Sequence, residues 1–448
     1  MRENCKATER RRRAAKLIHA LTIAGAGLAA AALLLMARAQ ADTLTTLYSF
    51  CTEFNCADGD DPQGGLAADA SGNLYGTTSE GGARGGGTVF ELIHPSGGKG
   101  WKYRVLYNFC ANECAGGETL SLVTPVIDSA GNVYGTTVMG GSADFGTVFK
   151  LTPNANGKRW TNTILYNFCT RSSACPDGYY PGPLTYAGAG SGALYDGASP
   201  LYGVAGGGGK HFQGVAYSLT PNAHGKWVQK TLYAFCKEGG PACTDGKFPY
   251  GLTVDGNGNL AGVAGGGINN SGVAFRLSPV VGERQWAETL LYAFCSLANC
   301  ADGNDPRPVI VDQAGNLVGV AAQGGNTACN GGCGIIFKIA PDGTESVLYD
   351  FCSMSNCQDG SFPFTTLAMD ETGNLFGTAA NRGANNTGTA FEFDGSALQV
   401  LYSFCSKTDC SDGSFPEEGL VLDPAHDLFG LTAGGGAANL GTVFELKP

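Results

Sequence analysis

The chain has 448 residues, of which 70 are glycine and only 15% are Asp, Glu, Lys or Arg. Its formal net charge is −11, and an acidic surface argues against binding to nucleic acids and to anionic membranes. After residue 41 we find no stretch of 3.6-residue hydrophobic periodicity, so short strands and tight turns are expected rather than helices.

The N-terminal segment has the three parts of a secretory signal peptide. A basic region at 2–16 precedes an apolar stretch at 17–36 and a small-x-small sequence at 39–41. We therefore expect residues 1–41 to be removed on export and residues 42–448 to form a single domain. The alternative is a retained membrane anchor, because about 20 apolar residues can span a bilayer. An arginine run leaves the general and twin-arginine export routes both open.

Removal of this segment changes the charge balance of the chain. Residues 1–41 carry eight Lys or Arg and two Asp or Glu, so 20 basic and 37 acidic residues remain, with a net charge of −17. The mature chain is expected to avoid membranes and to act as a monomer. Because nothing follows Pro448 in the sequence, no C-terminal sorting tail is expected, and a freely secreted or periplasmic product is favoured.

Sixteen cysteines follow residue 41, and they fall into eight close pairs. Local pairing predicts eight small disulfide loops, which form in an oxidising compartment. Zinc binding is the alternative, but zinc pairs usually keep one short spacing, whereas three to six residues separate these partners. The pairs are Cys51 with Cys56, Cys110 with Cys114, Cys169 with Cys175, Cys236 with Cys243, Cys295 with Cys300, Cys329 with Cys333, Cys352 with Cys357, and Cys405 with Cys410.

One repeat runs through the rest of the chain. The string Leu-Tyr-x-Phe-Cys occurs seven times, 53 to 67 residues apart. In the first copy, three further apolar segments follow at 65–69, 72–78 and 87–92, separated by turns rich in Gly, Asn and Asp. Each repeat therefore predicts a four-stranded antiparallel sheet, with Leu-Tyr-x-Phe as its fourth strand. The Asp-x-x-Gly-Asn turns fit this pattern, because Gly and Asn tolerate positive φ and Asp can bind backbone amides.

The two ends of the mature chain complement each other. Residues 44–50 form a fourth strand with no strands of its own repeat before it, and residues 441–446 form a third strand with no fourth after it. Together they complete one sheet, which is how a ring of radially repeated sheets closes. The sequence thus predicts an all-β, seven-bladed β-propeller.

The repeat resembles a known family. The segment Gly-Asn-Leu-Tyr-Gly-Thr-Thr at 72–78, then Gly-Thr-Val-Phe-Glu-Leu at 87–92, with Leu-Tyr-x-Phe between copies, is similar to the GloVer tandem repeat of bacterial choice-of-anchor exported proteins. The resemblance covers nearly all of residues 44–448. It implies export and a repeat-built β fold, and it brings no catalytic residues.

In such a ring the first strand of each blade lines the channel. The loops before the first strand and after the second share one face, the loop face, which carries the cysteine loops. Ligands are expected there because its loops are longer and more varied. Regular aromatic residues of the strands, such as Tyr75, Tyr134 and Tyr202, are expected in the core between blades.

A recurrent aspartate follows the second cysteine of six cysteine loops. Six carboxylates at equivalent places could bind calcium, and Asp60, Asp61 and Asp305 would add ligands suited to a hard cation. The alternative, which recurrence in nearly every blade favours, is that each aspartate caps its own turn. The six are Asp58, Asp177, Asp245, Asp302, Asp359 and Asp412.

Positions that differ between blades are better candidates for a binding site. The residue after the loop proline starts the first strand and is predicted to lie at the channel mouth. It is Gln63, Gly182, Tyr250, Arg307, Phe364 and Glu417 in six blades, and Glu418 adds a carboxylate. The loops after the second strands contribute Glu80, Arg84, Met139, Lys210, His211, Phe212, Asn326 and Arg382. This variety is equally typical of a ligand site and of unselected surface change.

Signatures of catalysis are few. Of the four histidines after residue 41, only His211 is predicted on the loop face, and no Gly-x-Ser-x-Gly or His-Glu-x-x-His motif occurs. Two carboxylates such as Glu80 and Glu417 could serve a glycosidase. Blade three departs from the repeat through an expanded hairpin at 187–200, and blade five through its extra pair, Cys329 and Cys333.

Three functions remain open from the sequence. The leading hypothesis is an exported, non-catalytic propeller that binds extracellular glycan or protein. The second is a carbohydrate-active hydrolase or lyase that uses carboxylates at the mouth, with calcium as an optional cofactor. The third is a structural cell-surface protein.

Overall fold

The computed structural model describes residues 43–95, 100–110, 124–237, 239–240, 243–283 and 286–448. Within them, Leu44–Lys447 form one compact unit. The described residues contain 29 strands, five short 3₁₀ helices and no α-helix. Among these residues, no helix has the length and apolar character needed to cross a membrane. The predicted signal peptide lies outside the described residues.

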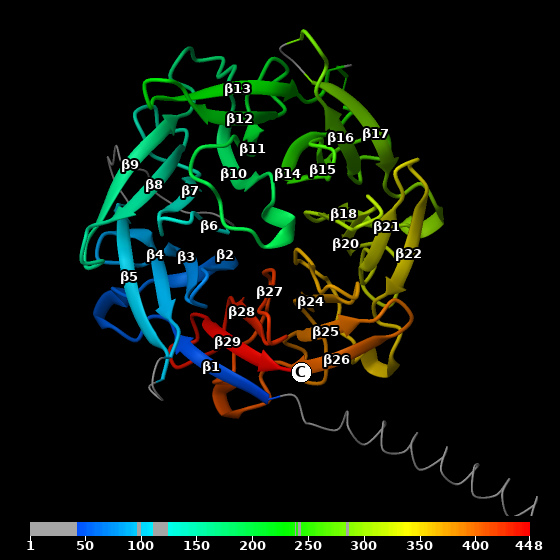
Figure 1. Cartoon of the computed structure of the whole chain (residues 1–448). Helices are drawn as coiled ribbons and strands as arrows, with labels where there is room; N and C mark the ends of the chain where they lie inside the picture. Colours follow the sequence, from blue (N-terminus) through cyan, green and yellow to red (C-terminus); the bar gives the residue numbers. More distant parts are fainter. Residues whose placement is uncertain (1–42, 96–99, 111–123, 238, 241–242, 284–285) are drawn as a thin grey trace, which may run out of the picture. The chain divides into compact units, whose positions relative to one another are not determined.

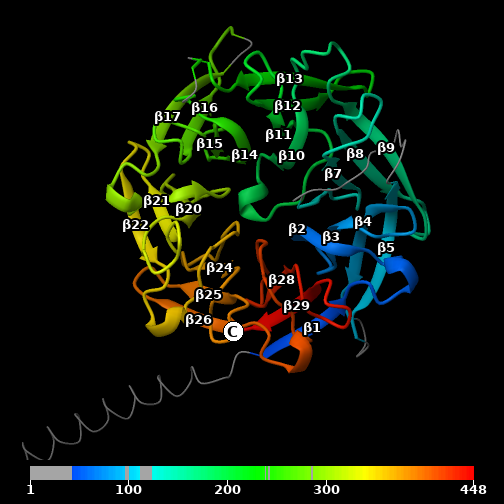
Figure 2. The same ribbon diagram turned by 180° about the vertical axis from the view of Figure 1, so that it is seen from behind.

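Seven blades, each a sheet of antiparallel strands, form a ring (Figures 1 and 2). Blade one contains β2 (Asp60–Ala68), β3 (Leu74–Glu80), β4 (Gly85–Ile93) and β5 (Lys102–Cys110). Blade two contains β6 (Val126–Ile127), β7 (Val133–Thr137), β8 (Thr147–Pro153) and β9 (Trp160–Asn167). Blade three contains β10 (Tyr179–Tyr186), β11 (Leu201–Gly207), β12 (Val215–Pro221) and β13 (Trp227–Ala234). Blade four contains β14 (Lys247–Val254), β15 (Leu260–Gly265), β16 (Val273–Ser278) and β17 (Ala287–Ala293).

Blade five contains β18 (Asn304–Pro306), β19 (Ile310–Val311), β20 (Leu317–Gln323), β21 (Ile335–Ile339) and β22 (Glu345–Asp350), because its first strand is split in two. Blade six contains β23 (Ala368–Met369), β24 (Leu375–Ala379), β25 (Thr389–Phe393) and β26 (Leu398–Ser403). Blade seven contains β27 (Val421–Leu422), β28 (Leu428–Thr432), β29 (Thr442–Lys447) and β1 (Thr43–Ser49). The 3₁₀ helices are η1 (Phe54–Cys56), η2 (Ala189–Ser191), η3 (Ala298–Cys300), η4 (Ser355–Cys357) and η5 (Thr408–Cys410).

The N-terminal strand closes the ring. The sheet of blade seven has the order β1-β29-β28-β27, so the first strand of the chain pairs with the last. Just beyond β1, the amide of Phe50 donates to the carbonyl of Gly441 at 3.1 Å. Figure 1 shows the Leu-Tyr-x-Phe strands on the outside of the ring and the first strands of the blades on the inside. The predicted seven-bladed propeller and its closure are confirmed.

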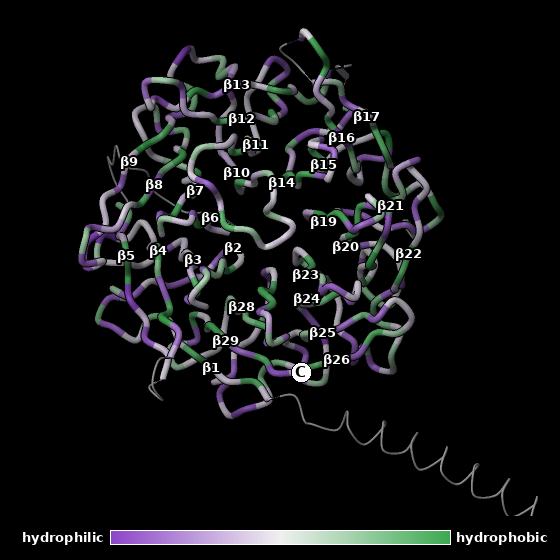
Figure 3. The backbone as a smooth tube through the Cα atoms, in the orientation of Figure 1, coloured by the Kyte–Doolittle hydropathy of each residue, from purple (hydrophilic) through white to green (hydrophobic). Residues whose placement is uncertain are grey.

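The core lies between blades and rests on one recurrent aromatic pair. The Phe of each Leu-Tyr-x-Phe strand packs against the aromatic residue of the third strand in the next blade, as in Phe50–Phe90, with ring centroids 5.3 Å apart. The glycine of the second strand makes room for that ring, since a Cβ on Gly76 would lie 2.4 Å from Cζ of Phe90. Figure 3 shows hydrophobic residues along the strands and many hydrophilic ones in the outer loops. Tyr75 and Tyr134 are buried in this core, as predicted.

The tight turns have the predicted chemistry. Asp69 accepts hydrogen bonds from the amides of Ser71 and Asn73 and from the side chain of Asn73. A carboxylate that binds amides two and four residues ahead holds the turn without help from another blade. The same arrangement recurs at Asp128, Asp255, Asp312, Asp370 and Asp423.

Seven of the eight predicted disulfides join described residues, each within its own loop. The eighth pair includes Cys114, which lies outside the described residues. The seven bonds are Cys51 to Cys56, Cys169 to Cys175, Cys236 to Cys243, Cys295 to Cys300, Cys329 to Cys333, Cys352 to Cys357, and Cys405 to Cys410.

The loops that end at Cys175 and Cys243 are the two longest, with partners six and seven residues apart in sequence. Both cysteines are buried, and both have positive φ, at 45° and 44°. The carbonyl of Cys175 accepts hydrogen bonds from the amides of Gly178 and Gly209. That of Cys243 accepts from the equivalent pair, the amides of Gly246 and Gly267. The two longer loops thus reach the same geometry, in which the carbonyl of the second cysteine binds two glycine amides.

The positions of the cysteine sulfur atoms also bear on zinc binding, which was the alternative to disulfide formation. Sulfur atoms of Cys329, Cys333 and Cys352 lie within 4.8 Å of one another, but here they belong to two disulfides. A disulfide sulfur is not the thiolate that zinc requires, so the oxidised protein matches the disulfide prediction.

The expanded hairpin of blade three reaches the centre of the ring. Figures 1 and 2 show the segment that carries η2 at this central position. Beside it, Tyr195 is fully buried, and its backbone bonds to Ile127 and Ser129 of blade two. Its hairpin joins a first strand to a second strand, so it belongs to the face opposite the loop face.

Candidate functional site

The recurrent aspartates of the cysteine loops anchor the fold. Asp58 is fully buried and accepts hydrogen bonds from the hydroxyl of Tyr48 at 2.7 Å and from the amides of Thr52 and Glu53. In five further blades the equivalent tyrosine and aspartate form the same bond at 2.7–2.8 Å. In the structure these aspartates therefore cap the cysteine loops in which they stand.

The four carboxylates proposed as calcium ligands lie in two places. Asp58 and Asp60 belong to the start of blade one, and Asp302 and Asp305 to the start of blade five. Among the described residues, the three-ligand groups at metal-binding distances include only Asp60 of these four, beside Cys51 and Cys56. Those two cysteines are joined in a disulfide. Calcium binding stays a prediction.

A set of residues that sequence reasoning missed stands directly before the loop prolines. All six have φ between 49° and 61°, in the left-handed region, which is unusual for bulky side chains. In five of them the amide bonds to a carbonyl in the preceding blade at 2.8–3.2 Å, which holds this conformation. The six are Asp61, Tyr180, Phe248, Asp305, Phe362 and Phe415. Their recurrence before proline was the signal in the sequence.

This backbone geometry turns aromatic rings outward on the loop face. Phe248 is 47% exposed, and Tyr180 and Phe415 are 41% and 40% exposed. A bulky residue in the left-handed region costs about 1–3 kcal/mol, and such positions cluster at functional sites. Four aromatic residues and two carboxylates at equivalent places therefore surround the start of the first strands. We call these six residues the mouth ring.

The residues after the prolines form a second set, and three of them lie against one another. The guanidinium carbon of Arg307 lies 3.4 Å from the ring centroid of Phe364 and 5.5 Å from that of Tyr250. Arg307 also forms an ion pair with Asp305 of the mouth ring. Blades four, five and six are thereby joined by a cation between two aromatic faces.

The opposite side of the mouth is acidic. Oδ2 of Asp61 accepts hydrogen bonds from Nε2 of Gln63 and from the hydroxyl of Ser79. The pKa of Glu417 is raised, mainly by burial and to a smaller extent by the charge of Asp61. Burial raises the pKa of Glu418 to about 8, and the charges of Glu417 and Asp61 add to this effect. These carboxyl groups, from blades seven and one, are close enough to influence each other's ionisation.

The remaining candidates are Glu80, Lys210 and His211. Glu80 ends β3 and pairs with Asp60 across the sheet, and burial together with Glu80 raises the pKa of Asp60. Lys210 and His211 lie between β11 and β12. In the described part of the chain, no hydrogen bond or ion pair joins their side chains to the other candidates. Catalysis by the pair Glu80 and Glu417 stays a prediction, and Glu417, Glu418 and Asp61 form the acidic group at the mouth.

Comparison with solved structures finds chains of low identity. The Trypanosoma rangeli sialidase in complex with the inhibitor DANA is 9% identical, with a TM-score of 0.40 over 90% of this chain and 59% of that chain. The polysaccharide lyase Uly1 is 12% identical, with a TM-score of 0.47 over 89% of this chain and 92% of that chain. The chain thus spans 59% of the length of the sialidase. No curated protein sequence matches the chain.

The repeat itself identifies the family. The Gloeobacter/Verrucomicrobia repeat matches residues 33–196, 126–333 and 296–448, which together extend over nearly the whole chain. The matched segments carry the Gly-Asn-Leu-Tyr-Gly and Leu-Tyr-x-Phe strings that build the blades. The chain belongs to the Gloeobacter/Verrucomicrobia repeat family.

Proposed function

We propose that the protein is an exported propeller that binds a neutral extracellular glycan at the mouth ring without transforming it. The observation that carries the proposal is the exposure of aromatic rings in left-handed backbone geometry on the loop face. A sugar ring offers apolar C–H groups to an aromatic face and hydroxyl groups to acceptors. Phe248 and Phe415 supply such faces, and the carboxylate of Asp61 is an acceptor.

The charge of the mouth favours a neutral ligand. The only cation of the second set, Arg307, already pairs with Asp305, whereas Asp61, Glu417 and Glu418 have no cationic partner among the described residues. An anionic glycan would meet this acidic side at an electrostatic cost. Export is supported by seven disulfides within loops, since disulfides persist in oxidising compartments.

The test replaces rings without damaging the backbone. Asn tolerates the left-handed region, so Phe248→Asn and Phe415→Asn are expected to fold at least as stably as the parent protein. Both are expected to weaken binding of neutral oligosaccharides on a glycan array by tenfold or more. Phe54→Ala is the matched control, because Phe54 is 88% exposed but lies outside the mouth ring. Equal binding by the parent and the mouth variants would contradict the proposal.

A second candidate, a carbohydrate-active hydrolase, rests on the raised pKa of Glu418. A carboxyl group with a pKa of about 8 can donate a proton near neutral pH, which is the role of a general acid beside a second carboxyl group. Here Glu418 would donate the proton and Glu417 would be the second carboxylate. Release of reducing ends from a neutral polysaccharide, reduced at least 100-fold in both Glu417→Gln and Glu418→Gln, would support it. Binding without turnover would exclude it.

A further inference from the structure

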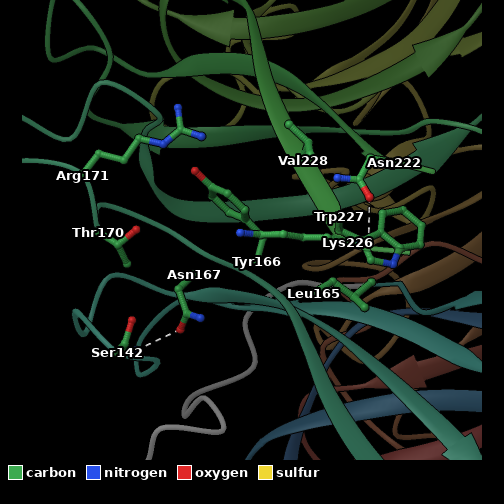
Figure 4. Close-up of a pocket in the computed structure, with 10 residues that line it drawn as sticks. All are labelled: Ser142, Leu165, Tyr166, Asn167, Thr170, Arg171, Asn222, Lys226, Trp227 and Val228. Carbon is green, nitrogen blue, oxygen red and sulfur yellow. Dashed lines mark hydrogen bonds between the residues drawn. The ribbon is translucent and has the colours of Figure 1, made fainter. Parts of the chain in front are cut away.

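A cavity of about 590 Å³ lies on the outer edge of the ring, away from the mouth. It forms where β9 of blade two ends and β13 of blade three begins. Figure 4 shows Tyr166 in its centre, with Arg171 on one side and Asn222, Lys226 and Trp227 on the other. Its volume is within the range of about 300–1,000 Å³ that small-molecule sites usually have.

The wall of this cavity is rich in hydrogen-bond donors. The side-chain oxygen of Asn167 accepts from the amide of Ser142, and that of Asn222 accepts from the amides of His224 and Lys226. Because both oxygens accept from backbone amides, the –NH₂ groups of these side chains remain as hydrogen-bond donors. Arg171 and Lys226 add charged donors, and none of the ten lining residues is Asp or Glu.

The two cations are not neutralised by the protein. In the described part of the chain, neither Arg171 nor Lys226 forms an ion pair. This is notable in a chain whose net charge after residue 41 is −17. Two uncompensated cations around one cavity create a local positive potential that attracts an anion.

The cationic lining is specific to this cavity, which we call the groove, and is not a feature of the repeat. The position of Arg171, two residues after the first cysteine of its loop, is Glu53, Leu297 or Met354 in other blades. Where it is Lys407, the ammonium group donates to the carbonyl of Leu44. The cationic character therefore does not follow from the requirements of the fold, which all blades share.

We propose that this groove binds the carboxylate of an acidic sugar, independently of the neutral glycan at the mouth. The planar guanidinium of Arg171 can bind a carboxylate through two parallel hydrogen bonds, and Lys226 adds a second charge. Tyr166 and Trp227 supply aromatic surface for the sugar ring, and the two amide groups supply donors for its oxygens. The ligand class is thus a uronic acid unit.

The experiment compares glucuronate with its methyl ester, which differ in charge, by calorimetric titration of the purified protein. Glucuronate is expected to bind and the ester to bind at least tenfold more weakly. Arg171→Ala combined with Lys226→Ala is expected to weaken glucuronate binding at least tenfold without changing the melting temperature, since both side chains are exposed. Lys158→Ala combined with Arg159→Ala, on the hairpin before β9 and outside the cavity, is the matched control.

The result separates this groove from the mouth. Phe248→Asn and Phe415→Asn are expected to leave glucuronate binding unchanged, whatever they do to neutral glycans. Absence of glucuronate binding, equal binding of acid and ester, or loss of binding in the mouth variants would each overturn the assignment.

Discussion

Deletion of residues 43–50 is expected to remove the cooperative unfolding transition of the protein at ordinary temperatures. These residues contain β1, the outer strand of blade seven. Phe50 is fully buried between Phe90 and Tyr103, and Leu44 is buried in the core of blades six and seven. Loss of two such side chains costs about 3–5 kcal/mol each, and the backbone bonds to β29 are lost as well. The sum approaches the roughly 5–15 kcal/mol that stabilises a typical domain.

The deletion is best compared with a chain that begins at residue 43 and keeps β1. Both retain the Cys51–Cys56 disulfide, so they differ only in the closing strand. Thermal melting followed by circular dichroism measures the effect. A synthetic peptide of residues 43–50 is expected to restore part of the transition, because the exposed edge of β29 can pair with a strand added in trans. If the truncated chain melts like the longer one, the strand does not close the ring.

Stability is expected to decrease as the pH rises from about 4.5 to about 8, by about 3 kcal/mol in total, because three carboxyl groups must then ionise. Burial, followed by the nearby charge of Asp245, raises the pKa of Glu288 to about 7, and burial with Asp302 does the same for Glu345. Glu418 has a pKa of about 8. Each group binds its proton more tightly in the folded chain than in the unfolded one. Their stabilising contribution is therefore complete below about pH 4.5 and lost above about pH 8.

The positions of Glu288 and Glu345 in the repeat explain why they are protonated. Both stand four residues before the tyrosine of Leu-Tyr-x-Phe, where other blades have Tyr103 and Gln229. Tyr103 and Gln229 donate hydrogen bonds to the carbonyls of Asp58 and Asp177. Oε1 of each glutamate is buried and has no hydrogen-bond partner in the described structure. A protonated glutamate can donate as Gln229 does, whereas the ionised form cannot.

Replacement of the three glutamates by glutamine tests this account. Glu288→Gln, Glu345→Gln and Glu418→Gln each keep a hydrogen-bond donor at every pH. The stability of the triple variant is therefore expected to fall much less with rising pH than that of the parent. At about pH 8.5 the triple variant should be more stable than the parent by about 1 kcal/mol per site. The effect is smaller than for fully buried carboxyl groups, because these side chains are only half-buried and solvent screens their charges. Urea denaturation at about pH 5 and about pH 8.5 measures both effects. A parent protein that is equally stable at the two pH values would contradict it.

Part of the candidate site followed from the sequence, and part did not. The sequence predicted the residues after the loop prolines at the mouth, and the structure adds that Tyr250, Arg307 and Phe364 lie against one another. The residues before the prolines were missed, because nothing in the type of Phe248 or Phe415 indicates a positive φ. That conformation depends on a hydrogen bond to a carbonyl of the preceding blade, which is 28 to 35 residues away in sequence.

Local and periodic information determined the architecture of this protein. The number of blades, the order of their strands, the closing strand, the disulfide loops and the turn aspartates depend on contacts within one repeat or between identical repeats. The sequence pattern can specify such contacts because the residues that make them recur in each repeat. Only the tertiary structure decided which side chains from different blades meet. The mouth ring, the acidic group of Glu417, Glu418 and Asp61, and the cationic groove between blades two and three all depend on how unlike residues are packed side by side, which no repeat encodes.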